Sequence, residues 1–309
     1  MEKQQENGQK TAFIAIVGRP NVGKSSILNA MIGQKIAIVS RKPQTTRTRI
    51  TGILTRGETQ LVFTDTPGLH KPRNRLGDYM VKAVNQSVAG VDACLLVAEA
   101  GAGISYADEE LIGRFRSMGI PAVLAINKID LLKEKSDLMQ EIAAFSQKFD
   151  FEAIVPVSAM NHSGIKELIA ELSKLSMPGM HFFDDTALTD QPDKVLAAEI
   201  VREKLLRLLD KEVPHGIAVA VERMQERENG SEILDIDATI ICERDGHKGI
   251  IIGKGGETLK KVGTLARVDM EKFFGCKVNL KLWVKVKEDW RNRQNLLQSF
   301  GYDSRYLDE

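Results

Sequence analysis

The sequence has few cysteines and no long apolar run. Its three cysteines, Cys94, Cys242 and Cys276, are far apart, which excludes a disulfide framework and a zinc site of the usual ligand spacing. No stretch reaches the roughly 18 apolar residues that a membrane span needs, and residues 1–10 lack the apolar core of a signal peptide. We therefore expect a protein of the reducing cytoplasm with a disordered N-terminal tail, residues 1–10.

A large net charge is also absent, because the 309 residues carry a formal net charge of +1. The charges are nevertheless unevenly placed. From Asp184 to Ile240 there are 14 acidic and 7 basic residues, whereas from Arg244 to Arg293 there are 13 basic and 6 acidic residues. Neighbouring stretches of opposite charge predict a surface that attracts anions on one side only.

Two different orders of secondary structure follow one another along the chain. Between residues 11 and 175, short β-branched runs alternate with helical patterns, which predicts an α/β domain with a mostly parallel sheet and helices on both faces. The more polar residues 48–54 indicate an antiparallel edge strand. Residues 192–295 have the order helix, strand, strand, helix, helix, strand, which is typical of a small α+β domain. We assign residues 176–191 to a linker and residues 296–309 to a C-terminal tail.

The strongest chemical motif follows the first predicted strand, residues 12–17. The segment Gly18-Arg19-Pro20-Asn21-Val22-Gly23-Lys24-Ser25 matches the pattern G-x-x-x-x-G-K-[ST] and opens a predicted helix. Its glycines allow main-chain N–H groups to converge on phosphate oxygens, and the helix N-terminus adds positive potential. We expect Lys24 to bridge the β- and γ-phosphates and the Ser25 hydroxyl to ligate Mg²⁺.

Three further segments each follow a predicted strand, in the order that a guanine-nucleotide site requires. In Asp65-Thr66-Pro67-Gly68-Leu69 we expect Asp65 to hold Mg²⁺ and the Gly68 N–H to reach the γ-phosphate. In Asn127-Lys128-Ile129-Asp130 the Asp130 carboxylate can accept two hydrogen bonds from the N–H edge of guanine, which adenine lacks. The main chain of Ser158-Ala159 can donate to the guanine carbonyl. The set predicts GTP as the ligand.

A polar loop, residues 35–47, lies between the phosphate-binding helix and the edge strand. We expect Thr46, with Thr45 as the alternative, to ligate Mg²⁺ only when the γ-phosphate is present. An ordinary solvated loop is the competing interpretation. Leu69 stands where Ras-like GTPases have the glutamine that orients water, so Lys24, Thr46, Asp65 and Gly68 form the predicted catalytic set, and hydrolysis should be slow. A catalytic role for His70 is a weaker alternative.

A second motif lies in the basic stretch. Ile252-Gly253-Lys254-Gly255-Gly256 joins an apolar helix end to a new helix through a G-x-x-G turn. Small residues allow a nucleic-acid backbone to approach closely, and Lys254 adds positive charge. We predict nucleic-acid binding at this turn, against the alternative of a structural turn on a charged face.

These motifs make the chain similar to the Era family, bacterial GTPases with a C-terminal KH domain. The similarity covers about residues 11–302 and includes Gln44-Thr45-Thr46-Arg47 and His70-Lys71-Pro72. It implies a P-loop GTPase domain followed by a KH domain of the second type. It also implies binding near the 3′ end of small-subunit ribosomal RNA, a timing role in assembly of that subunit, and peripheral association with the inner membrane. Asn21 matches the asparagine with which potassium-activated relatives hold K⁺.

The leading hypothesis is thus a monomeric, cytoplasmic, GTP-regulated RNA-binding assembly factor. The second hypothesis is a membrane-surface signalling GTPase whose basic C-terminal face binds anionic lipid. RNA binding by residues 180–309 would favour the first, and lipid binding without RNA affinity the second. A KH module with an inactive nucleotide site is disfavoured by Lys24, Ser25 and Asp65.

Overall fold

The computed structural model describes residues 8–40, 42, 45–67, 74–87, 90–210, 213–227 and 232–302. The described chain forms two compact units. The first contains residues 8–37, 46–67 and 81–190, and the second contains residues 38–45, 74–80 and 191–302, with the gaps just given. Two short segments that the sequence assigns to the nucleotide-binding domain, residues 38–45 and 74–80, thus belong to the second unit.

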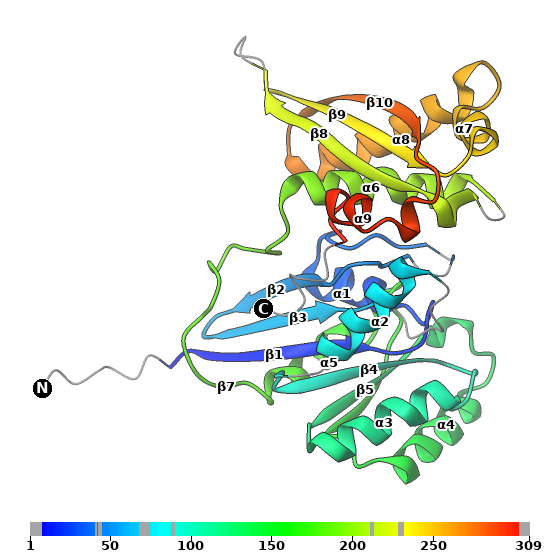
Figure 1. Cartoon of the computed structure of the whole chain (residues 1–309). Helices are drawn as coiled ribbons and strands as arrows, with labels where there is room; N and C mark the ends of the chain where they lie inside the picture. The colour runs from blue at the N-terminus through cyan, green and yellow to red at the C-terminus, as the bar shows by residue number, and fades with distance from the viewer. Residues whose placement is uncertain are drawn as a thin grey trace, which may run out of the picture. The chain divides into compact units, whose positions relative to one another are not determined.

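The first unit is built on a mostly parallel sheet (Figure 1). Its strand order is β2-β3-β1-β4-β5-β6, and a short β7 pairs with β1. The predicted edge strand is confirmed, because β2 is antiparallel to β3. The strands are β1 (Lys10–Val17), β2 (Ile50–Arg56), β3 (Thr59–Asp65), β4 (Ala93–Glu99), β5 (Ala122–Asn127), β6 (Ala153–Pro156) and β7 (Met177–Pro178).

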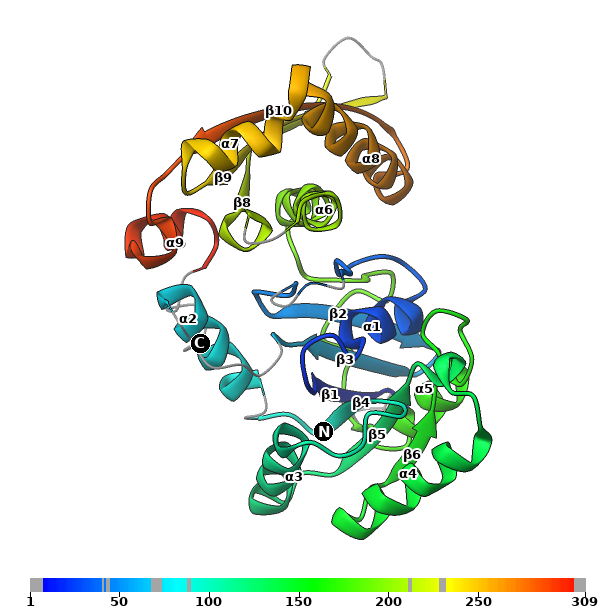
Figure 2. The ribbon, with the colours of Figure 1, turned by 90° about the vertical axis from the view of Figure 1, so that its right-hand side faces the viewer.

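Helices cover both faces of this sheet, as Figure 2 shows. On β1, Ala15 and Val17 pack in a buried cluster with Phe115 of α3 and Phe145 of α4. The alternate residues of the strand point to the opposite face, which carries α1 and α5. The motif loops follow the carboxyl ends of the strands, where ligands bind in open α/β sheets. The helices are α1 (Lys24–Ile32), α2 (Arg75–Ser87), α3 (Tyr106–Met118), α4 (Lys135–Lys148) and α5 (Ile165–Ser173).

The second unit has the predicted element order. Its sheet order is β10-β9-β8, with β9 and β10 parallel and β8 antiparallel to β9. Ile240 of β9, Leu205 of α6, Ile251 of α7 and Ala266 of α8 are fully buried in one core on one face of this sheet. The sequence Asn229-Gly230 predicts a turn between the first two strands of this unit, and these two residues lie outside the described ones. The elements are α6 (Asp193–Leu208), β8 (Ala218–Glu226), β9 (Ile233–Cys242), α7 (Asp245–Ile252), α8 (Glu257–Phe274) and β10 (Lys277–Val286).

The opposite face of this small sheet is covered at one end by aromatic residues. Trp290 stacks on Tyr302 with ring centroids 6.0 Å apart, and Trp290 Nε1 donates to the Gly216 carbonyl at 2.9 Å. Tyr79 meets Tyr302 edge to face. The stretch that we assign to a C-terminal tail therefore includes a packed helix, α9 (Gln294–Ser299), and buries Leu297 and Tyr302. Among the described residues, no helix is long and apolar enough to cross a membrane.

The predicted linker is fastened along the edge of the first sheet, and we call residues 177–189 the strap. Gln60, which is fully buried, donates to the Phe183 carbonyl at 3.0 Å and accepts from the Phe182 and Phe183 N–H groups. Ile53 N–H donates to the Leu188 carbonyl at 2.9 Å. Because these bonds lie along most of its length, the strap is part of the first unit.

The His181 side chain fastens the strap to the turn between β2 and β3. Its Nδ1 lies 2.6 Å from Asp185 Oδ1 and its Nε2 lies 3.1 Å from the Glu58 carbonyl oxygen. Burial of the ring alone would lower the pKa of His181, but these hydrogen bonds outweigh burial and raise it above the usual 6.5. Both ring nitrogens face acceptors, an arrangement that only the protonated ring satisfies fully.

We expect the stabilisation from His181 to be complete below about pH 6.5 and lost as the pH rises through its raised folded-state pKa. His181→Ala should therefore speed amide hydrogen exchange of residues 180–185 more at about pH 6 than at about pH 8.5, after correction for the intrinsic exchange rate. An equal effect at both pH values would show that His181 acts only by packing.

Candidate functional site

The phosphate-binding loop depends on glycine at two positions. A Cβ at Gly18 would lie 2.4 Å from the Val97 carbonyl oxygen, and a Cβ at Gly23 would lie 2.2 Å from Nδ2 of Asn127. Both glycines have positive φ, and Asn21 between them has φ of 66°, which asparagine tolerates better than most residues. The loop ends where α1 begins, so the N-terminal N–H groups of this helix are available to an anion.

Lys24 folds back over this loop. Its Nζ donates to the Gly18 carbonyl at 3.0 Å and to the Arg19 carbonyl at 2.9 Å. Burial lowers the pKa of Lys24 to about 8, although the negative charge of Asp65 opposes this shift. A bound polyphosphate would supply the negative charge that favours the protonated ammonium.

Three side-chain oxygens expected to bind Mg²⁺ lie together. Ser25 Oγ donates to Asp65 Oδ2 at 2.6 Å and lies 3.0 Å from Thr46 Oγ1. Burial raises the pKa of Asp65, while the Lys24 charge and the hydrogen bonds oppose the shift. Thr46 is the residue that reaches this cluster, because the Thr45 hydroxyl instead donates to the Lys42 carbonyl at 2.6 Å.

The loops expected to hold guanine are tied to each other and to the phosphate loop. Asn127 Nδ2 donates to the Val22 carbonyl at 2.8 Å, and Asn127 Oδ1 accepts from the Ala159 N–H at 3.1 Å. The Ser158 hydroxyl donates to Asp130 Oδ1 at 2.5 Å. Asp130 is exposed, so its carboxylate remains accessible to a base.

The segment after β3 is described only in part. Thr66 Oγ1 donates to the Ile16 carbonyl at 2.9 Å, which fixes the end of β3 beside β1. Pro67 is buried next to it. The expected contacts of Gly68 and Leu69, and the alternative at His70, fall outside the described residues.

Two carboxylates at this site were missed by the sequence analysis. Asp108 Oδ2 lies 3.3 Å from Arg19 Nε, so the Arg19 side chain extends to the start of α3. Glu99 Oε2 lies 2.8 Å from Lys128 Nζ. No local sequence pattern marks either carboxylate as part of the site, because its ion-pair partner is distant in sequence.

In the second unit, the G-x-x-G turn separates α7 from α8. Three glycines of the turn have positive φ, and a Cβ at the first would lie 2.2 Å from Thr258 Oγ1. A Cβ on either of the last two would meet no described atom within 4 Å, so this side of the turn is open. Lys254 is exposed and Ile252 is half-buried. The residues are Ile252, Gly253, Lys254, Gly255 and Gly256.

A groove of about 430 Å³ runs from this turn between α8 and β10. Leu280 and Leu282 give it apolar walls, while Lys260 and Arg267 add positive charge. Apolar walls with cationic groups suit unstacked bases and their phosphates. The lining residues are Gly256, Leu259, Lys260, Gly263, Thr264, Arg267, Leu280 and Leu282.

The sequence analysis did not select this groove. The groove residues of α8 recur at spacings of three and four, which places them on one face of the helix. The two groove residues of β10 are two positions apart, which places them on one face of the strand. The same spacings also describe an ordinary amphipathic surface, so only the fold distinguishes the groove from such a surface.

Comparison with known proteins identifies both domains. A family model described as 50S ribosome-binding GTPase matches residues 13–128, and a KH domain model matches residues 212–291. GTPase Era of Clostridioides difficile (strain 630) is 48% identical over 296 residues, which are 96% of this chain and 99% of that protein. GTPase Era of Ruminiclostridium cellulolyticum is 47% identical over 95% of this chain and 97% of that protein.

Two solved structures are similar over almost the whole chain. A crystal structure of an Aquifex aeolicus Era variant bound to GDP.AlF4- has a TM-score of 0.91 at 38% identity, covering 96% of this chain and 100% of that one. Era in complex with MgGDPNP and nucleotides 1506-1542 of 16S ribosomal RNA has a TM-score of 0.90 at 38% identity, covering 96% and 99%. With its P-loop domain followed by a KH domain, the chain belongs to the Era family of GTPases.

Proposed function

We propose that this GTPase binds RNA near the 3′ end of 16S ribosomal RNA through its KH groove and acts as a timer in assembly of the small ribosomal subunit. The carrying observation is the cationic groove beside the open G-x-x-G turn. The similar Era structure that holds nucleotides 1506-1542 of 16S ribosomal RNA supports this choice of RNA. The small ribosomal subunit is assembled in the cytoplasm, so we propose a cytoplasmic location for this protein.

The proposed cofactor is Mg²⁺, as in the similar complex with MgGDPNP. The residues fit this ion, because Ser25, Thr46 and Asp65 present hard oxygen ligands. Asp65 Oδ1 is buried and accepts no hydrogen bond from any residue that the structure describes, which leaves it available to an ion or its water. When bound, Mg²⁺ neutralises charge on the β- and γ-phosphates.

The protein's own groups would bind GTP and orient it for hydrolysis. The amides of the P-loop and of the first turn of α1 hold the phosphates, and the Lys24 ammonium stabilises charge on the β- and γ-phosphates. Asp130 selects guanine, while Asn127 fixes the guanine loops against the P-loop. These groups position GTP, and the sequence provides no glutamine after Gly68 to orient water.

A timer must bind its RNA differently before and after hydrolysis. We expect the full chain loaded with GDPNP to bind a 16S 3′-end fragment at least about tenfold more tightly than the GDP-loaded chain, a typical coupling between two ligands. Fluorescence anisotropy with labelled RNA at fixed salt measures both affinities. Equal affinities would leave an RNA-binding GTPase but would contradict the timer.

We further propose that K⁺ binds at Asn21 and accelerates hydrolysis. Without RNA, turnover should be slow, on the order of the 10⁻⁴ s⁻¹ of unstimulated Ras, and faster in KCl than in NaCl. Asn21→Gly should abolish the difference between the two salts. Glycine suits this test because Asn21 has φ of 66°, so the loop can keep its conformation without the side chain. A salt preference that survives the substitution would exclude Asn21 as the K⁺ ligand.

A further inference from the structure

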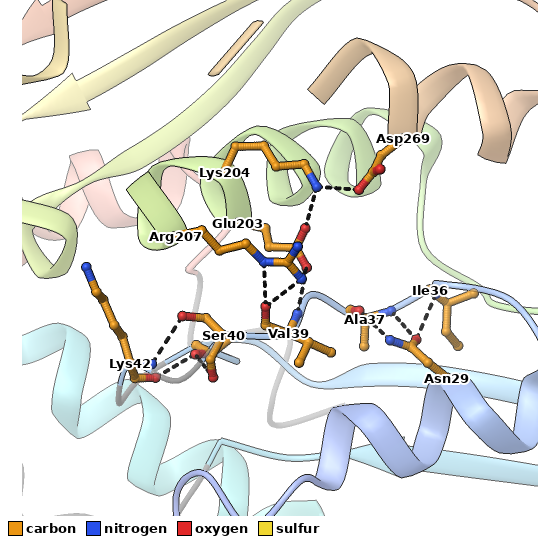
Figure 3. Close-up of polar contacts among 11 residues, drawn as sticks. Asn29, Ile36, Ala37, Val39, Ser40, Lys42, Glu203, Lys204, Arg207 and Asp269 are labelled. Atoms are coloured by element: carbon orange, nitrogen blue, oxygen red, sulfur yellow. Dashed lines mark hydrogen bonds and ion pairs between the residues drawn. The ribbon is translucent and has the colours of Figure 1, made fainter. Parts of the chain in front are cut away.

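The loop that leads to Thr46 is anchored at its start in the first unit. Asn29 of α1 accepts hydrogen bonds at Oδ1 from the N–H groups of Ile36 at 3.0 Å and Ala37 at 2.9 Å. Its Nδ2 donates to the Ala37 carbonyl at 2.7 Å (Figure 3). The chain enters the loop from this fixed point.

The described residues in the middle of the loop, 38–40, 42 and 45, belong to the second unit, and Val39 and Thr45 contact α6. Glu203 Oε1 accepts from the Val39 N–H at 3.0 Å, and Arg207 donates to the Val39 carbonyl from Nε at 3.3 Å and Nη2 at 3.2 Å. Both main-chain polar groups of Val39 are therefore bonded to side chains of one helix. At the other end of this segment, Arg202 Nη2 donates to the carbonyl of Thr45.

The side chains that hold the loop are themselves fixed. Arg202 and Glu203 are fully buried, and Arg202 donates twice to Glu199, at 2.6 Å and 2.5 Å. Glu203 Oε2 accepts from Lys204 at 2.8 Å, and Lys204 also pairs with Asp269 of α8. Loss of the loop would leave this network incompletely paired. Removing the partner of a buried charge destabilises the folded protein, so the network favours the bound loop.

The held carbonyl is adjacent to a proposed metal ligand. Thr45 and Thr46 are consecutive, and the Thr46 hydroxyl lies with Ser25 and Asp65. We propose that Arg202, Glu203 and Arg207 are positioning residues for the GTPase reaction, which restrict the main chain of Val39 and Thr45 so that the Thr46 hydroxyl is held at the metal site. The inference rests on the proposed role of Thr46 toward Mg²⁺ and does not depend on RNA binding.

The test uses the full chain and Arg207→Ala, because the Arg207 side chain is half exposed and its loss leaves the core intact. In the nucleotide-free protein, this variant should exchange the amides of residues 38–46 faster. With Mg²⁺ present, it should release a fluorescent GTP analogue about tenfold faster, the effect of one charge-assisted hydrogen bond. Release of GDP should not change, because we expect Thr46 to ligate Mg²⁺ only when the γ-phosphate is present. Glu203→Gln keeps an acceptor for Val39 and should have a smaller effect.

Arg227→Ala is the matched control, because it removes an arginine–carboxylate pair, with Asp235 at 2.6 Å, elsewhere in the same unit. It should leave loop exchange and nucleotide release unchanged. Thr46→Ala separates the two proposals: if it does not speed release of the GTP analogue, the metal role of Thr46 is wrong. Suppose that Thr46→Ala speeds release of the GTP analogue. The positioning role is then wrong if Arg207→Ala changes neither loop exchange nor release of the analogue. It is also wrong if Arg207→Ala speeds release of GDP as much as release of the GTP analogue.

Discussion

Asp130→Asn should weaken GTP binding by at least about 3 kcal/mol, more than a hundredfold, and should shift preference to xanthosine triphosphate. We expect the carboxylate to accept two guanine N–H groups, whereas the Asn amide would present a donor to one of them. Xanthine carries a carbonyl where guanine has its amino group, so the amide can donate to it. Titration with fluorescent GTP and XTP analogues measures both effects.

The structure indicates that this substitution tests the base contact and not the fold. Asp130 is exposed and its side chain accepts from Ser158, a bond that an Asn oxygen can still accept. Asp150→Asn removes another exposed carboxylate of the same unit and should leave both affinities unchanged. If Asp130→Asn binds GTP like the parent, Asp130 does not contact the base.

Replacing Lys254 and Gly255 with Asp should reduce RNA affinity at least about a hundredfold while GTP affinity is retained. The aspartates place negative charge where backbone phosphates pass, and a side chain at position 255 obstructs their close approach. A Cβ at Gly255 meets no described atom within 4 Å, so the obstruction acts on RNA rather than on the protein. GTP affinity should survive because the nucleotide motifs lie in the first unit.

The other end of α8 provides a matched control. Gly275 also has positive φ and open space around its Cβ position, and Lys277 is exposed beside it. Gly275→Asp with Lys277→Asp thus repeats the charge change and the backbone strain about 30 Å along the helix, and should bind RNA like the parent. Competition among short RNAs of equal length and charge tests base readout. Equal competition by all, with no loss in the Lys254 and Gly255 variant, would favour the lipid-binding hypothesis.

The sequence was most predictive where local chemistry determines structure. The sequence pattern predicts a helix over residues 24–32, and α1 has these limits because Gly23 and Gly33, both with positive φ, stand at its two ends. The alternation of apolar residues likewise predicts a strand over residues 233–242, and β9 has these limits. The helical pattern predicts a helix over residues 108–118, whereas α3 begins two residues earlier at Tyr106, because the pattern does not include the capping box of Ser105 and Asp108.

What the sequence did not reveal depends on partners far along the chain. The contacts of Val39 with Glu203 and Arg207 span more than 160 residues, and no local pattern marks Val39 as a docking point. The same holds for Tyr302, whose burial requires Trp290 and Tyr79. Phosphate and guanine motifs, by contrast, are contiguous because each occupies one loop after one strand.

The strap is one of the chain connections that limit how far binding at one unit can be separated from chemistry at the other. Thr189 Oγ1 donates to the Thr51 carbonyl at 2.7 Å, and α6 begins at Asp193. The intervening chain, residues 190–192, can extend by at most about 14 Å. An RNA held by the KH domain therefore experiences the nucleotide domain at a high effective concentration, whatever orientation the two adopt.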